Sequence, residues 1–124
     1  MRVLTHIARI LLGLIFLIFG LNGFFLFIPV PEFHPFVSIL VSSRYIYLIK
    51  TVEVVGGVFL LSNRFVPLGL VLLGPDILNI LAYHILLDHR NWPIAVVNLV
   101  LFLILVWGYR EYFKSLFVAK AEIE

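Results

Sequence analysis

The chain has 124 residues, of which 63% are hydrophobic and 13% charged, so it forms one domain too apolar for a soluble protein of this size. Its nine Lys and Arg residues are scattered and give a net charge of only +2, which excludes a nucleic-acid-binding surface. It has no cysteine, which excludes disulfides, thiolate metal sites and thiol exchange by the protein itself. We therefore expect a single domain over residues 1–124, with the lipid bilayer as its surroundings.

Four apolar segments predict membrane-spanning helices, each of which needs about 20 predominantly apolar residues. The first is too long, and too bulky at its end, for a cleaved signal peptide. The predicted fold class is therefore an all-α membrane protein, a four-transmembrane-helix antiparallel bundle. Its spans cover residues 10–27, 45–61, 67–87 and 94–112.

The segments between these spans carry turn signals. Residues 28–35 contain three prolines, which remove backbone donors and disfavour helix, so a loop is expected there. Residues 36–43 are apolar but too short to span, and we expect a short helix at the membrane interface. Pro75 is expected to kink the third span because its ring removes one backbone hydrogen bond.

The distribution of basic residues predicts that both termini are cytoplasmic, since cytoplasmic flanks carry the excess of Lys and Arg. Tyrosine and tryptophan near both predicted boundaries agree with this orientation. Six basic residues fall on the side of the termini: Arg2, Arg9, Arg64, Arg110, Lys114 and Lys120. The other three fall on the opposite side: Arg44, Lys50 and Arg90.

Several polar side chains lie within the predicted spans, where an ionisable group costs roughly 2.5 to 3.5 kcal/mol at the centre and so suggests a function. Helical rise places Glu53 and Asp76 near mid-depth, with the other polar groups in the outer half. Asp76 and Asn79 share a helix face that we expect to point inward. The predicted pocket opens outward and comprises Asn22, Lys50, Glu53, Asp76, Asn79, Tyr83 and His84.

Other interpretations of these residues remain open. Lys50 with Glu53, and Asn22 with Asn98, would also serve as polar contacts that hold the helices together. Two carboxylates at one depth would instead share a proton or bind a cation. A haem ligated by His84 is disfavoured because no second histidine lies at matching depth, and no residue pair has recognised metal-ligand spacing.

A pattern of short motifs resembles a known family. The chain has an early Arg9 and the motifs GLNGFF at 20–25, FIPVP at 27–31, KTVEVVGG at 50–57, LLSNRFVP at 60–67 and PDILNI at 75–80. Together they resemble the DoxX-like family of small four-helix bacterial membrane proteins over essentially the whole chain. The resemblance implies a multi-pass protein of the cell inner (cytoplasmic) membrane. It highlights Arg9, Asn22, Glu53, Asn79 and His84.

The resemblance also implies a function, because the family takes its name from a subunit of a thiosulfate:quinone oxidoreductase. It suggests a membrane or quinone-docking subunit of a redox complex. No flavin or iron–sulfur motif is present, so a partner subunit would supply the electrons. Phe24, Phe25, Tyr83 and Glu53 are the candidates for an apolar slot that holds the quinone.

Two other functions are consistent with the sequence, and whether the chain is an enzyme stays open. The intramembrane carboxylates and the proline in the third span are also typical of a small transporter or channel component, which would need to form a homo-oligomer. A structural or assembly factor, whose polar residues only join helices, is the third alternative.

Overall fold

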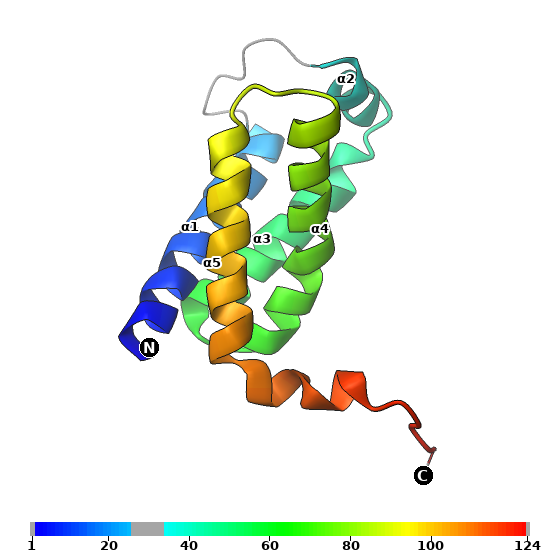
Figure 1. Cartoon of the computed structure of the whole chain (residues 1–124). Coiled ribbons are helices and arrows are strands. Elements are labelled where there is room, and N and C mark those ends of the chain that lie inside the picture. The colour runs from blue at the N-terminus through cyan, green and yellow to red at the C-terminus, as the bar shows by residue number, and fades with distance from the viewer. Residues whose placement is uncertain (1, 26–33, 124) are drawn as a thin grey trace.

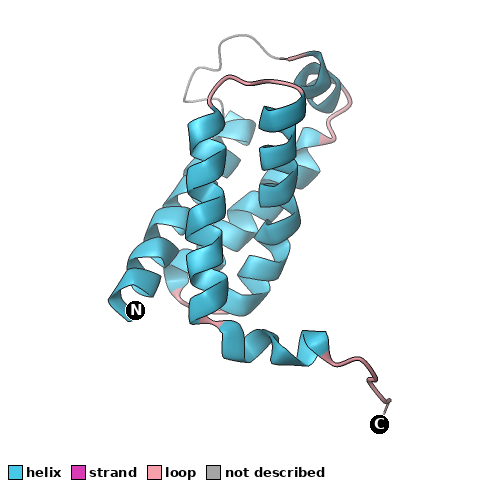
Figure 2. Ribbon diagram, in the orientation of Figure 1, coloured by secondary structure: helices cyan, strands magenta, loops and turns pink. Residues whose placement is uncertain are grey.

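The computed structural model describes residues 2–25 and 34–123, and within these ranges every regular element is helical (Figures 1 and 2). The predicted all-α class is confirmed. The α-helices are α1 Arg2–Phe25, α2 Pro35–Ser42, α3 Ile46–Ser62, α4 Val66–Leu86 and α5 Trp92–Gly108, followed by the 3-10 helix η1 Arg110–Phe117.

Four of these helices form a bundle. α1 contacts α3, α3 contacts α4, α4 contacts α5 and α5 closes the ring against α1, while the short α2 contacts α3 at one end (Figure 1). Apolar side chains repeat every three or four positions on each inward face, as amphipathic helical packing requires. The most completely buried side chains are Leu12, Phe16, Leu60, Leu70, Leu73, Ile77 and Leu105.

The outer surface of the bundle is as apolar as its interior. Leu78 and Leu103 lie in the middle of helices, yet 64% and 55% of their surface is exposed. Exposing such a continuous apolar surface to water is unfavourable, whereas contact with lipid chains is favourable. α1 and α4 are each long and apolar enough to cross a membrane, and the number rises to four if α2 with α3, and α5 with η1, count as bent spans. The fold is therefore compatible with a helical membrane bundle.

α1 and α5 have different bounds from the predicted first and fourth spans, because α1 begins earlier and α5 ends earlier. α1 begins at Arg2, well before residue 10. The buried Arg9 guanidinium is accommodated because Nη1 donates to the carbonyls of Leu60 (2.5 Å) and Leu61 (3.3 Å) in the last turn of α3. The last carbonyls of a helix lack the usual partner four residues ahead, and although the Leu60 carbonyl also accepts from the Asn63 N–H at 3.3 Å, Arg9 adds a charged donor that caps α3.

α5 ends at Gly108 rather than continuing to residue 112, and η1 turns away from it by 84° (Figure 1). Arg110 folds back over the Trp107 ring at 4.4 Å and donates to the Trp107 carbonyl at 2.8 Å, which stabilises the change of direction. Tyr112 and Phe117 of η1 are exposed. The prediction that the fourth span continues to residue 112 was wrong. The helix ends at Gly108, and the charged segment that follows lies at 84° to it.

The connections agree with the predicted turns where the structure describes them. The predicted loop at 28–35 falls outside the described residues except for its last two, and the last of these, Pro35, begins α2. Asn63 ends α3 in the left-handed conformation that asparagine tolerates, and Pro67 lies in the first turn of α4. α4 is continuous through Pro75, so the proline does not divide this helix in two.

α1 and α3 approach each other closely along a line of glycines. A Cβ atom on Gly57 would lie 2.8 Å from the Leu17 backbone nitrogen and 3.0 Å from the Gly13 carbonyl oxygen. A Cβ atom on Gly20 would lie 2.8 Å from a Val54 methyl group. Small residues at such positions allow backbones to come close and gain packing contacts, which drives helix association in lipid.

Candidate functional site

A cavity of about 220 Å³ lies between the four bundle helices. Each helix contributes residues three or four positions apart, which is the spacing of one helix face. The lining residues are Ile15, Phe16 and Phe19 of α1, Lys50 and Glu53 of α3, Ile80 and His84 of α4, and Ile94 and Asn98 of α5. Apolar walls with four polar groups are the usual composition of a small-molecule site.

Lys50 and Glu53 form an ion pair in this cavity, as their spacing on α3 allowed. The Lys50 Nζ lies 3.0 Å from Glu53 Oε1, and the Glu53 side chain is only 4% exposed. Although the ammonium is this close, Oε1 receives no well-aligned hydrogen bond from any described residue. The carboxylate therefore keeps unused acceptor capacity beside the cavity.

Asp76 supports Glu53 from α4. Its carboxyl group is within hydrogen-bonding reach of the Glu53 carboxyl group and also interacts with the Lys50 charge. A hydrogen bond between two carboxyl groups requires a proton between them. Asp76 Oδ2 is buried and has no hydrogen-bond partner in the described part of the chain. Asp76 therefore interacts with Glu53, but it is not among the residues that line the cavity, and a functional pocket with both carboxyl groups stays a prediction.

Asn98 contributes the fourth polar group. It is 5% exposed, and within the described ranges its Oδ1 atom has no hydrogen-bond partner. Sequence reasoning treated it as a helix-joining contact of Asn22 and left it out of the pocket. A signal for it was available, because Asn98 is the single polar residue in the interior of the fourth apolar segment.

His84 lies between the cavity and the end of the bundle at which α4 meets the α4–α5 connection. Its ring lines the cavity, and Nδ1 is 3.2 Å from the Asp88 backbone carbonyl. A carbonyl oxygen can only accept, so Nδ1 carries the proton in this contact. In the neutral ring, Nε2 is then the hydrogen-bond acceptor.

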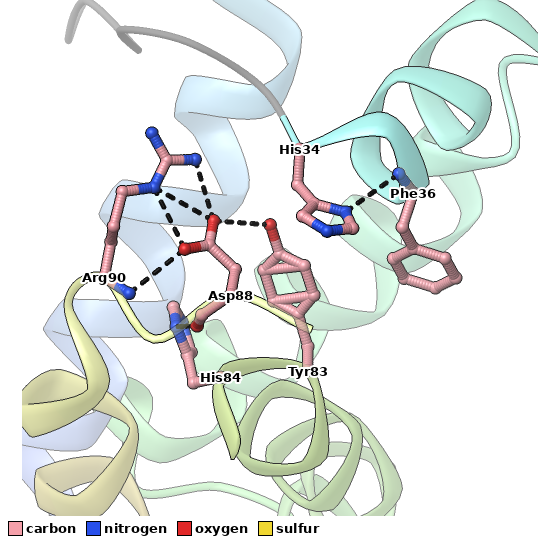
Figure 3. Close-up of polar contacts among 6 residues, drawn as sticks. All are labelled: His34, Phe36, Tyr83, His84, Asp88 and Arg90. Atoms are coloured by element: carbon pink, nitrogen blue, oxygen red, sulfur yellow. Dashed lines mark hydrogen bonds and ion pairs between the residues drawn. The ribbon is translucent and has the colours of Figure 1, made fainter. Parts of the chain in front are cut away.

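Tyr83 belongs to a separate polar cluster near the C-terminal end of α4 (Figure 3). The Tyr83 hydroxyl donates to Asp88 Oδ2 at 3.1 Å, and Arg90 Nη2 donates to the same oxygen at 2.7 Å. The hydrogen bonds from Arg90 hold the pKa of Asp88 well below its usual value. The His34 ring meets Tyr83 edge-on at 5.7 Å. This cluster ties the start of α2 to the α4–α5 connection.

Three residues predicted for the pocket or its walls lie elsewhere. Asn79 is exposed, because the buried face of α4 runs through Leu73 and Ile77, and two positions beyond Ile77 is about 200° around the helix. Phe24 stacks on Tyr47 at 5.4 Å, and Phe25 is exposed. The expectation that Asn79 faces inward was wrong.

The remaining predicted residue, Asn22, is buried in α1 with 6% of its surface exposed, but it is not one of the cavity-lining residues. The aromatic wall is formed instead by Phe19 and Phe16, about one and two turns before Asn22 on α1. Of the predicted set, the structure thus gathers Lys50, Glu53 and His84 around one cavity.

No protein-family model, curated protein or solved structure matches this chain. The geometry of the cavity and the residues that form it therefore carry the functional argument. The ion pair, the neighbouring carboxyl group, the imidazole and the amide offer donors, acceptors and exchangeable protons in or beside a half-open cavity with apolar walls.

Proposed function

We propose that the protein is a DoxX-like, quinone-docking subunit of a redox complex in the cell inner (cytoplasmic) membrane. The observation that carries this proposal is the cavity between the four helices, with aromatic and aliphatic walls and the polar groups of Lys50, Glu53, His84 and Asn98. The resemblance of the sequence motifs to the DoxX-like family supports it. A partner subunit supplies the electrons, and the chain provides the site for the quinone ring.

The cavity suits a single ring rather than a large ligand. Its volume of about 220 Å³ is below the usual 300 to 1,000 Å³ range of drug-sized sites. Phe16 and Phe19 offer faces for an aromatic ring, and Lys50 offers a cation to a ring oxygen. Glu53 and His84 are protonatable groups beside the same space. An isoprenoid tail would extend outward between the helices into lipid.

The membrane arrangement proposed with this function has four spans and two cytoplasmic termini. In Figure 1 the N-terminus, the α3–α4 turn and η1 lie at one end of the bundle. That end gathers most of the basic residues, including Arg2, Arg64 and Arg110, which favours its cytoplasmic placement. The polar cavity then lies toward the outer half of the membrane.

Cysteine labelling tests this orientation without interference, because the chain has no native cysteine. In intact cells, Asn91→Cys in the α4–α5 connection should react with a membrane-impermeant maleimide, whereas Ser115→Cys in η1 should react only after the cells are opened. The reverse pattern would show that the termini face outward. Labelling of both positions in intact cells would contradict the proposed number of spans.

Quinone binding tests the function. Wild-type protein purified with its lipids should contain extractable quinone, and folded Lys50→Met protein should retain roughly tenfold less, because Lys50 is the charged donor for a quinone oxygen and such a hydrogen bond contributes about 1.5–3 kcal/mol. Asp76→Asn should have a smaller effect, since Asp76 does not line the cavity. Lys114→Met, in the exposed η1 segment, is the matched control. Wild-type protein without quinone, and unable to bind it when supplied, would refute the proposal.

A second function is favoured by one specific observation, the direct approach of the Glu53 and Asp76 carboxyl groups between two helices. Paired acidic groups within a membrane are typical of proton or cation pathways. Proton flux in vesicles that contain the purified protein, abolished by both Glu53→Gln and Asp76→Asn, would favour a transporter or channel component. Full complementation of a deletion strain by both amides would instead favour a structural or assembly role.

A further inference from the structure

Around the cavity, the buried polar atoms that lack a hydrogen-bond partner among the described residues are acceptors. Glu53 Oε1 and Asn98 Oδ1 are both buried, and neither has a hydrogen-bond partner among the described residues. With Nδ1 of His84 directed to the Asp88 carbonyl, the neutral ring adds a third acceptor at Nε2. The one cation in the cavity lining, Lys50 Nζ, already lies 3.0 Å from Glu53 Oε1.

These acceptors indicate what a bound ring should carry. The oxygen atoms of a quinone only accept hydrogen bonds, so a quinone would leave Glu53 Oε1 and Asn98 Oδ1 unsatisfied. Each hydroxyl group of the corresponding hydroquinone can donate one hydrogen bond. Leaving a buried acceptor unpaired is costlier than the average gain from making a hydrogen bond, so this difference should be visible in affinity.

We infer that the cavity selects the reduced, hydroxyl-bearing form of the ring, with Glu53 and Asn98 as acceptors for its two hydroxyl groups. The inference rests on the proposed function and makes it more specific: the site holds the hydroquinone in preference to the quinone. Phe16 and Phe19 supply the apolar surface for either form, so their contribution does not distinguish the two.

The test is a comparison of two ligands on one protein. Wild-type protein in nanodiscs is titrated anaerobically with a short-tailed benzoquinone and, separately, with the same molecule in its hydroquinone form. The hydroquinone should bind about tenfold more tightly, as expected for one buried acceptor that gains a donor. Equal affinity, or tighter binding of the quinone, would overturn the inference and leave the quinone-docking function in place. Failure of both forms to bind would overturn the proposed function itself.

Two asparagine variants test whether Asn98 is responsible for the preference for hydroquinone over quinone. Asn98→Leu should weaken hydroquinone binding about tenfold and leave quinone binding within twofold of wild type, because only the hydroquinone uses the Oδ1 acceptor. Asn79→Leu removes the same chemical group from an exposed position of α4 and should leave both affinities unchanged. An equal loss for both ligands in Asn98→Leu would contradict the assigned role. The wild-type comparison needs no variant and decides the question even if Asn98→Leu does not fold.

Discussion

Replacing Lys50 by Met should lower the free energy of unfolding by about 3–5 kcal/mol, the usual effect of removing one partner of a buried ion pair. The Glu53 side chain is only 4% exposed and lies 3.0 Å from the ammonium, so its charge would lose its compensation inside the bundle. Tryptophan fluorescence during denaturation by sodium dodecyl sulfate in mixed micelles would measure the change.

Two further variants show whether the loss comes from the pair itself. The double variant Lys50→Met/Glu53→Gln should recover most of the lost stability, because it removes both charges together. Lys114→Met is a control with the same spacing: its partner Glu111 lies 2.8 Å away, but the two side chains are 70% and 65% exposed. It should cost less than about 1 kcal/mol. Additive effects of the Lys50 and Glu53 changes would show that the two residues are not coupled.

Replacing Gly57 by Ala should destabilise the protein by about 1–3 kcal/mol, the range observed for overpacked cores. The added methyl group would lie 2.8 Å from the Leu17 nitrogen and 3.0 Å from the Gly13 oxygen, so α1 and α3 must separate. Both obstacles are backbone atoms, which cannot rotate aside as a side chain can. The direction of the stability change is informative, because replacing Gly by Ala within a helix normally stabilises a protein by about 0.8–1.0 kcal/mol. A loss of stability would therefore point to the close contact between α1 and α3.

The control for this change is Val58→Leu, which also adds one carbon atom to α3. Val58 is 45% exposed on the outer surface of the bundle, so the change should alter stability by less than about 0.5 kcal/mol. Both variants would be compared with wild type by the same unfolding measurement. A Gly57→Ala protein as stable as wild type would show that α1 and α3 are not held at the close distance seen here.

The candidate site was predictable only in part. Lys50 and Glu53 were placed together from their spacing on one helix, and depth along the spans brought Asp76 to the level of Glu53. The position of Asn79 was misjudged because sequence neighbours within one turn were assigned to the same face. Asn98 was left out of the predicted pocket because it was considered as a helix-joining partner of Asn22, although a lone amide in an apolar helix already indicates an inward face.

The sequence by itself determined the helical class, the apolar exterior, and the approximate bounds of α3 and α4, because length and hydropathy act locally along the chain. Tertiary structure decided the rotation of each helix about its axis, and hence which polar groups meet. That rotation depends on packing between helices, such as the close approach at Gly57 and the burial of Leu73 and Ile77, which no single segment encodes. It also decided that Arg9 caps α3, a contact between residues 51 positions apart.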